Sequence, residues 1–259
     1  MKVIGDRWKK ALWWAGSLTA VGLIAFGIVY LVKFERGQEF VDEFLNWKIF
    51  KETFWYVFTG LRITVTVALV SEVFILVAGL LVALVRISRV KLFRGLAAVY
   101  IDVIRGIPLL LQIFIVYYGV AILGLKMNIF WAGVLALTIC YAAYEAEIFR
   151  AGIESIHKGQ MEAARSLGMG YFKAMRFVIL PQAIRNVIPP LSNEFIALLK
   201  DTALLSVIGL AEITRRSSEM FGKKFNITPF VVGAVCYLIV TIPLMRLVQY
   251  VNKRLSVSD

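Results

Sequence analysis

Four polar residues lie in a stretch of the chain that is otherwise apolar, from about Ile188 to Leu210. A charged side chain at the centre of a bilayer costs roughly 2.5–3.5 kcal/mol on insertion scales, so such residues are expected to face the protein interior or a polar path. Seven residues make about two helical turns, which predicts one polar stripe in which two pairs of residues stack. Ion pairs between the stripe and other helices are the alternative, mainly for the last two of its four residues. The four are Asn193, Glu194, Lys200 and Asp201.

A basic segment from Arg150 to Pro190 separates apolar blocks and is interrupted by glycines. Lys and Arg outnumber Asp and Glu in it, and basic loops of membrane proteins lie on the cytoplasmic side. Apolar residues at helical spacing predict one short helix over Gln160–Leu167 and a second over Tyr171–Leu180. The break between them is expected at Gly168 and Gly170, and Pro181 is not expected inside a regular helix because it lacks an N–H.

Other kinds of chemistry have little support in the sequence. His157 is the only histidine and falls in the basic segment, and Cys140 and Cys236 lie within apolar stretches as small hydrophobic residues. No metal site, disulfide framework or catalytic residue is therefore predicted. The chain also lacks a G-x-x-x-x-G-K-[ST] loop, so it cannot hold ATP phosphates in that way.

The composition is that of an integral membrane protein. Of the 259 residues 60% are hydrophobic and 18% are charged, and the mean hydropathy is +0.78, whereas soluble domains carry about 25% charged residues. The net charge of +12 does not indicate nucleic-acid binding, because the basic residues fall between apolar blocks.

We expect an all-α polytopic protein with about six transmembrane helices and with both termini in the cytosol. A first helix that is retained as an anchor is expected before the other five spans. Outer segments are expected at Lys33–Leu61, partly as an interfacial helix, and at Ala211–Phe225, although four basic residues in the latter oppose this orientation. The six spans are Ala11–Val32, Ile63–Val85, Gly106–Leu125, Asn128–Phe149, Ile188–Leu210 and Asn226–Met245.

The basic segment resembles the EAA signature of bacterial ABC-importer permeases. Glu162, Ala163 and Ala164 are followed at the right spacing by Gly168 and by Leu180-Pro181, with Val178 where the signature usually has Ile. From about Phe54 onward the chain is similar to permease subunits of polar amino acid importers of the histidine, glutamine and arginine type. Further stretches that carry this resemblance are residues 105–110, 146–150, 158–160, 193–201 and 204–208.

The resemblance implies a permease domain with five core helices over residues 54–259, with the coupling loop at about 150–190. A peripheral N-terminal helix and an outer segment over 1–53 precede it. It implies a bacterial inner-membrane location, a second identical or homologous permease, an external amino acid-binding protein and an ABC ATPase that binds ATP–Mg. This chain itself would need no cofactor. The polar stripe would receive the ammonium and the carboxylate of an amino acid. The residues expected to couple to the ATPase are Gln160, Glu162, Ala163, Ala164, Gly168, Leu180 and Pro181.

A different class of protein remains as the alternative, namely an ion-coupled secondary transporter or a channel that works alone. In that case Glu72 and Glu194 would be proton or cation sites within the membrane. The EAA-type loop favours the ABC permease, because an ion-driven carrier has no use for it. Near the end of the fourth span we expect Glu147 to pair with Arg150, while Glu145 is either a pathway residue or a partner of Arg105.

Overall fold

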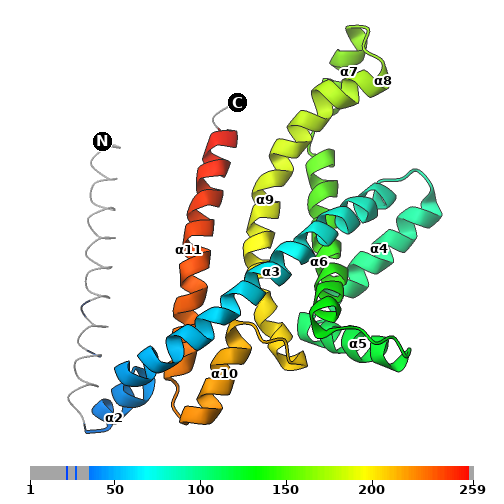
Figure 1. Ribbon diagram of the computed structural model, residues 1–259. Coiled ribbons are helices and arrows are strands. Elements are labelled where there is room, and N and C mark those ends of the chain that lie inside the picture. The colour runs from blue at the N-terminus through cyan, green and yellow to red at the C-terminus, as the bar shows by residue number, and fades with distance from the viewer. Residues whose placement is uncertain (1–21, 23–26, 28–34, 257–259) are drawn as a thin grey trace, which may run out of the picture.

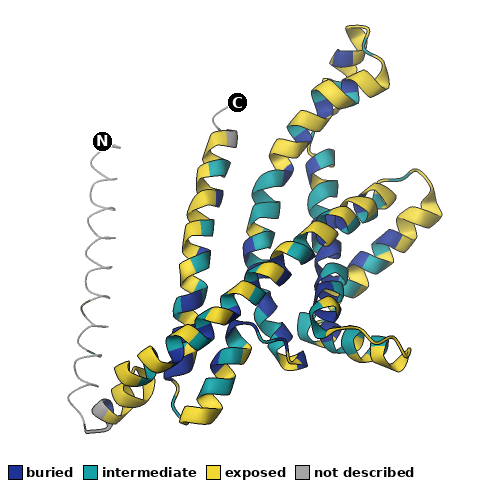
Figure 2. Ribbon diagram, in the orientation of Figure 1, coloured by how far each residue is buried: buried dark blue, intermediate teal, exposed yellow. Residues whose placement is uncertain are grey.

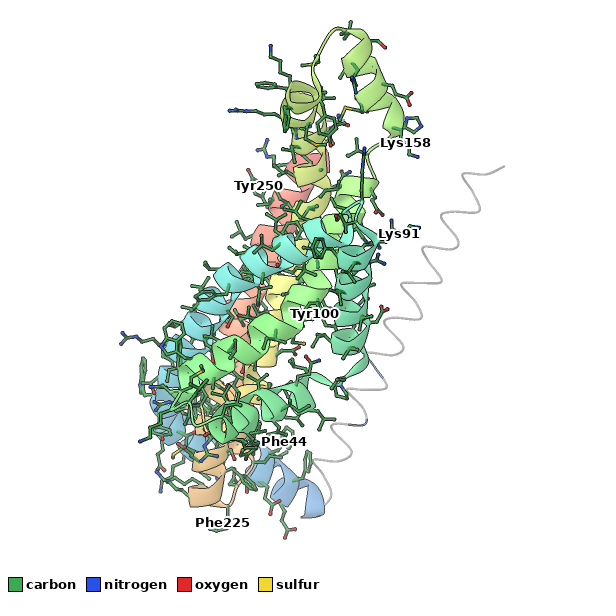
Figure 3. All side chains as sticks on the ribbon, turned by 90° about the vertical axis from the view of Figure 1, so that its right-hand side faces the viewer. Phe44, Lys91, Tyr100, Lys158, Phe225 and Tyr250 are labelled. Carbon is green, nitrogen blue, oxygen red and sulfur yellow. The ribbon has the colours of Figure 1, made fainter. Side chains whose placement is uncertain are left out.

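The computed structural model of the protein describes residues 22, 27 and 35–256, and all regular elements within these residues are helices (Figure 1). The predicted first span, Ala11–Val32, and its peripheral role lie outside the described residues, apart from two isolated positions. The helices form an elongated bundle. Lys158 lies near one end of it, and Phe44 and Phe225 lie at the other end (Figure 3).

The second predicted span is part of a much longer helix. After the short α2 (Glu35–Phe44), α3 runs without a break from Trp47 to Arg86. The helix of the second span therefore begins within the outer segment expected over Lys33–Leu61, and the predicted start at Ile63 is wrong. Asn46 starts α3, because its Oδ1 accepts from the amides of Lys48 and Ile49 at 3.1 and 3.2 Å. Forty residues span about 60 Å at 1.5 Å each, and α3 crosses the neighbouring helices obliquely (Figure 1).

The third predicted span, Gly106–Leu125, is also different in the structure. Two helices, α4 (Lys91–Gly106) and α5 (Leu109–Ile122), meet at a bend of 109°. Pro108 disfavours helical geometry at Ile107, which is extended. At this break Nε2 of Gln112 donates to two backbone carbonyls, at 2.7 Å for Ile104 and 2.8 Å for Ile107.

The central helix is α6 (Ile129–Glu154), which packs along α3 and also touches α4, α5 and α9. Much of its buried surface consists of small residues such as Ala132, Ala136 and Ala143, which let neighbouring helices approach closely. Leu137 on α6 joins a core cluster with residues from the other helices, and Figure 2 shows burial concentrated along α6.

The part of the basic segment after Gly170 and the fifth span form one nearly continuous rod. After α7 (Lys158–Ser166), the chain continues through α8 (Tyr171–Ala174), a π-helical turn (Met175–Ile179) and α9 (Leu180–Asp201). The predicted boundaries of the fifth span are therefore wrong, because α9 starts eight residues earlier than Ile188 and ends at Asp201. A 3₁₀ helix (Thr202–Ile208), α10 (Ile213–Lys224) and α11 (Thr228–Ser256) complete the described chain.

Within the described residues, three helices are long and apolar enough to cross a membrane, at Glu39–Arg86, Ile129–Glu154 and Thr228–Arg254. The bent pair of α4 and α5 makes a fourth if it counts as one span. The helix α9 is not among them, and it carries Arg185 as well as the charges of the predicted stripe.

Candidate functional site

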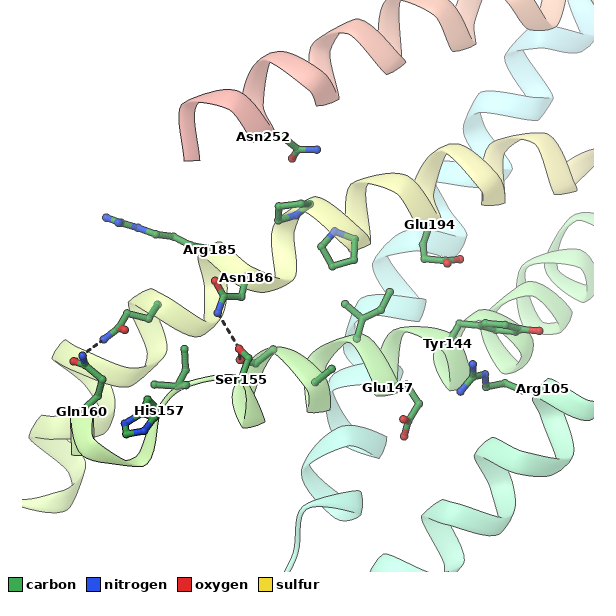
Figure 4. Close-up of a pocket in the computed structure, with 17 residues that line it drawn as sticks. Arg105, Tyr144, Glu147, Ser155, His157, Gln160, Arg185, Asn186, Glu194 and Asn252 are labelled. Atoms are coloured by element: carbon green, nitrogen blue, oxygen red, sulfur yellow. Dashed lines mark hydrogen bonds between the residues drawn. The ribbon is translucent and has the colours of Figure 1, made fainter. Parts of the chain in front are cut away.

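A cavity of about 1000 Å³ opens between α4, α6, α9 and α11 and extends to the start of α7 (Figure 4). Its wall combines charged, amide and hydroxyl side chains with two prolines. This volume is at the upper end of the range for small-molecule sites in proteins. The charged residues that line it are Arg105, Glu147, Arg185 and Glu194, together with His157.

The inner end of the cavity holds an acid and a base from different helices. Glu194 projects from α9 toward Tyr144 of α6, and Arg105 of α4 lies on the other side of the tyrosine ring (Figure 4). The guanidinium carbon of Arg105 is 5.3 Å from the centre of that ring, a distance at which a cation is attracted to an aromatic face. The cavity therefore offers a carboxylate and an oriented guanidinium to one solute.

Where α6 and α9 meet, the two helices approach closely. A Cβ added at Gly152 would lie 2.1 Å from Cγ2 of Val187, so a larger residue would push α9 away. Pro189 and Pro190, which precede the predicted polar stripe, lie inside α9 and line the cavity. Because neither proline can donate a backbone hydrogen bond, α9 is weakened at this level.

Glu147 and Arg150 pair as predicted. Nε and Nη2 of Arg150 lie 3.1 and 2.6 Å from the two carboxylate oxygens of Glu147, and Nη1 also reaches Glu154 at 2.5 Å. This confirms the interaction between residues three apart on one helix.

The predicted helix, glycine turn and second helix of the basic segment are confirmed, but the second helix, which was expected to end at Leu180, continues through the π turn into α9. Gly168 ends α7 with φ of +83°, a left-handed conformation that suits glycine. Its amide donates to the carbonyl of Arg165 at 3.0 Å, and the amide of Met169 donates to that of Ala164 at 3.1 Å, which is a Schellman motif. Pro181 was not expected inside a regular helix, and in the structure it directly follows a π turn. In that turn the amide of Leu180 donates to the carbonyl of Met175 five residues earlier.

The helix–turn–helix exposes apolar side chains. Leu167 is 84% exposed and Phe172 is 86% exposed, and Tyr171 and Phe177 are also exposed. Among the residues predicted to couple to an ATPase, Gln160, Glu162, Ala163 and Gly168 are exposed, Leu180 is 42% exposed, and Ala164 is buried. Clustered apolar exposure of this kind marks interaction surfaces.

Two side-chain contacts tie α9 to its neighbours here, one to the exposed element at Gln160 and one to the end of α6 at Ser155. Nε2 of Gln182 donates to Oε1 of Gln160 at 3.4 Å, and Nδ2 of Asn186 donates to Oγ of Ser155 at 2.9 Å (Figure 4). All four residues also line the cavity. The cavity and the exposed element thus share one wall.

The four residues of the predicted polar stripe lie in two rows. Glu194 lines the cavity, while Asp201 accepts a hydrogen bond from the hydroxyl of Tyr141 at 2.7 Å. Asn193 and Lys200 are exposed and do not line the cavity, because adjacent positions on a helix point about 100° apart. The prediction of a single stripe is therefore wrong.

Sequence reasoning did not assign Arg105 and Tyr144 to this cavity. The position of Arg105 just before Gly106-Ile107-Pro108 was the available signal, because a helix break exposes the residues beside it. Neither alternative for Glu145 holds, since it is fully buried, does not line the cavity, and lies against Glu72.

Comparisons with known proteins define the class. Residues 75–257 match the family of the binding-protein-dependent transport system inner membrane component. The chain belongs to this family, whose members are the membrane-spanning permease components of ABC importers.

Individual relatives agree with this assignment. The arginine transport system permease protein ArtQ of Bacillus subtilis (strain 168) is 38% identical over 79% of this chain and 94% of its own length. The probable glutamine ABC transporter permease protein GlnM of the same organism is 40% identical over 83% of this chain and 100% of its own length. A crystal structure of an amino acid ABC transporter with histidines superposes with a TM-score of 0.72 at 40% identity, covering 77% of this chain and 94% of that one. The comparisons favour the ABC permease over the ion-coupled carrier.

Proposed function

We propose that this permease carries polar amino acids and that the inner end of the cavity receives the substrate. Glu194 binds the ammonium group, and Arg105, held against the ring of Tyr144, binds the α-carboxylate. The observation that carries the proposal is the convergence of this acid and this base on one cavity of about 1000 Å³. Arginine suits the second role because its planar guanidinium binds a carboxylate through two parallel hydrogen bonds.

In this proposal Arg105, and not Lys200 of the predicted stripe, is the cation that binds the carboxylate of the substrate. Lys200 and Asn193 lie on an exposed face of α9, and a lysine facing lipid at mid-membrane is costly. We infer that this face meets a second permease subunit, identical or homologous. Asn193 then lines a path at the interface between subunits, which keeps its predicted role open to test.

The exposed element around Gly168 is the site that docks the ATPase. Its support is the apolar side chains of Leu167 and Phe172, which are almost fully exposed, together with the resemblance to the EAA signature. The ATPase supplies the ATP–Mg site, and this chain binds no cofactor. The docking element faces the cytosol, and an extracytoplasmic binding protein delivers the amino acid at the opposite end, near α10.

Transport follows from the position of α9 between the two sites. Its first turns contact the docking element through Gln182 and the adjoining end of α6 through Asn186, and Glu194 follows the Pro189-Pro190 pair. Movement of the docking element by the ATPase therefore shifts the wall of the cavity, with the proline pair as the point of bending.

The test compares Glu194→Gln and Arg105→Gln in proteoliposomes that contain the ATPase and the binding protein. Uptake is measured for a panel of polar amino acids and for the corresponding amines without the carboxylate. Direct access of amino acids and amines to the cavity is measured as ligand-dependent ATPase activity in the absence of the binding protein. Arg105→Gln should abolish the preference for the amino acid over its amine, and Glu194→Gln should weaken both.

The matched control is Arg89→Gln, which removes an exposed cation between α3 and α4 and should leave both measurements unchanged. Copurification of the ATPase should be normal in all three variants. Wild-type uptake and preference in both cavity variants would contradict the proposal.

A further inference from the structure

Two acidic side chains meet in the interior between α3 and α6. Glu145 on α6 is 0% exposed, and its carboxyl group lies within hydrogen-bonding reach of the carboxyl group of Glu72 on α3. Packing holds the pair in place, because Gly79 of α3 leaves room for Glu145, whose Cβ would lie 3.0 Å from a Cβ at that glycine. A larger residue at position 79 would displace Glu145.

Three of the four carboxyl oxygens of Glu72 and Glu145 have no hydrogen-bond donor in the described part of the chain. Neither Oε1 nor Oε2 of Glu145, nor Oε2 of Glu72, receives a hydrogen bond from any described side chain or backbone amide. The adjacent hydroxyl of Ser71 is likewise buried and makes no hydrogen bond to the described residues. In an apolar interior, ionised oxygens without donors cost several kcal/mol each.

A third acid, on the neighbouring helix α9, adds further repulsion to ionised forms of Glu72 and Glu145. Glu194 of α9 is the charged residue outside the pair whose field reaches both glutamates, and it is also an acid. Among the described residues no lysine or arginine forms an ion pair with Glu72 or Glu145. The nearby cation of α4, Arg105, is placed over Tyr144 instead.

Two ionised carboxylates cannot hydrogen-bond to each other, because both are acceptors only. One proton resolves this, since a protonated carboxyl group donates through its O–H to the carboxylate opposite. Paired carboxyl groups that share a site hold one proton between them for the same reason.

We propose that Glu72 and Glu145 form a proton-binding site inside the membrane domain, in which one bridging proton joins α3 to α6. The ligand is the proton itself. The site is separate from the substrate cavity, because neither glutamate lines that cavity, and it does not depend on which solute the permease carries. Its consequence is that the contact between the two helices weakens when the proton is lost.

The first measurement uses the full-length protein in lipid and does not depend on any variant. Infrared difference spectra between neutral and alkaline pH should contain the carbonyl stretch of a protonated carboxylic acid, lost on the alkaline side. This band should be absent in Glu145→Gln and in Glu72→Gln. Its absence from the wild-type protein would overturn the proposal.

The second measurement is stability against pH. Folded protein that holds one proton more than the unfolded chain has an unfolding constant that rises up to about tenfold per pH unit as the pH increases. The wild-type protein should show this alkaline loss. The double variant Glu72→Gln, Glu145→Gln should not, because each amide brings its own donor and keeps nearly the same shape.

The control is Glu43→Gln, an exposed acid on α2, which should keep the wild-type profile. If Glu145→Gln fails to fold, Glu72→Gln at the partly exposed side of the pair still carries the test. A bound alkali cation is the competing occupant. Stabilisation by sodium or potassium over choline at equal ionic strength and alkaline pH, with no protonated-acid band, would overturn the proton assignment.

Discussion

Nδ2 of Asn186 on α9 donates to Oγ of Ser155 at the end of α6, over 2.9 Å. One turn earlier Gln182 makes the parallel contact to Gln160 of α7. From Gln182 to Glu194 the helix rises about 18 Å. The docking element and the cavity are thus connected by a single helix whose only internal weak point among the described residues is the Pro189-Pro190 pair.

The hydrogen bond between Asn186 and Ser155 gives a first prediction, on the coupling of ATP hydrolysis to transport. Ser155→Ala combined with Asn186→Ala deletes a hydrogen bond worth about 0.5–1.5 kcal/mol. We expect the amount of substrate transported per ATP to fall roughly two- to tenfold, while the ATPase still binds. The measurement is uptake together with ATP hydrolysis in proteoliposomes. Ser192→Ala is the control, since its hydroxyl only bonds to the carbonyl of Ile188 within α9, and equal ratios in the two variants would refute the prediction.

The docking element gives a second prediction. Gly168→Val places a β-branched residue at φ of +83° and costs about 1–2 kcal/mol or more locally, while Glu162→Lys reverses an exposed charge on the same element. Both should reduce copurification of the ATPase without affecting membrane insertion. Gly170→Ala is the matched control, because Gly170 has an ordinary φ of −66° and open space around it. The docking role fails if copurification and transport are unchanged in both variants.

The contact between Tyr141 and Asp201 predicts a change in stability. Tyr141→Phe removes the 2.7 Å hydrogen bond and leaves the carboxylate without that donor, at a cost of about 1.5–3 kcal/mol for a bond to a charged group. Thermal unfolding in detergent should show the loss. Tyr118→Phe, at a position that is 55% exposed, should melt like the wild type. An unchanged melting temperature in Tyr141→Phe would mean that Asp201 finds another donor.

The pH dependence on the acidic side is predicted from α10. The hydroxyl of Tyr56 donates to Oε2 of Glu219 at 2.6 Å, and Arg215 lies 3.2 Å from Oε1. The hydrogen bond from Tyr56 is the main cause that lowers the pKa of Glu219. A lowered pKa in the folded state stabilises the protein fully above the unfolded value of about 4.3, and this stabilisation is lost as the pH falls through the folded value.

Acid unfolding measures this effect. Tyr56→Phe and Glu219→Gln should each make stability less dependent on pH in that acidic range. Glu43→Gln on the exposed side of α2 serves as the control. Parallel acid profiles for Tyr56→Phe and the wild type would contradict the prediction.

What the sequence by itself determined is local or compositional. The membrane class follows from an apolar content of 60%. The short helix α7, the break at Gly168 and the pair of Glu147 with Arg150 were all predicted correctly, because each depends on residues within a few positions of one another on the chain. Helical periodicity and glycine conformation act at that range without reference to the rest of the fold.

Only the tertiary structure decided which polar residues meet. Glu194 could face Lys200, lipid or another span as far as the sequence is concerned, and a rotation of α9 by one position, about 100°, would exchange the row of Glu194 for that of Asn193. The bend of 109° between α4 and α5 brings Arg105 to the cavity, and the close packing of α3 on α6 brings Glu72 to Glu145. These contacts join residues on different helices, 73 positions apart for Glu72 and Glu145. Their geometry depends on how those helices rotate and slide against one another, which no local pattern specifies.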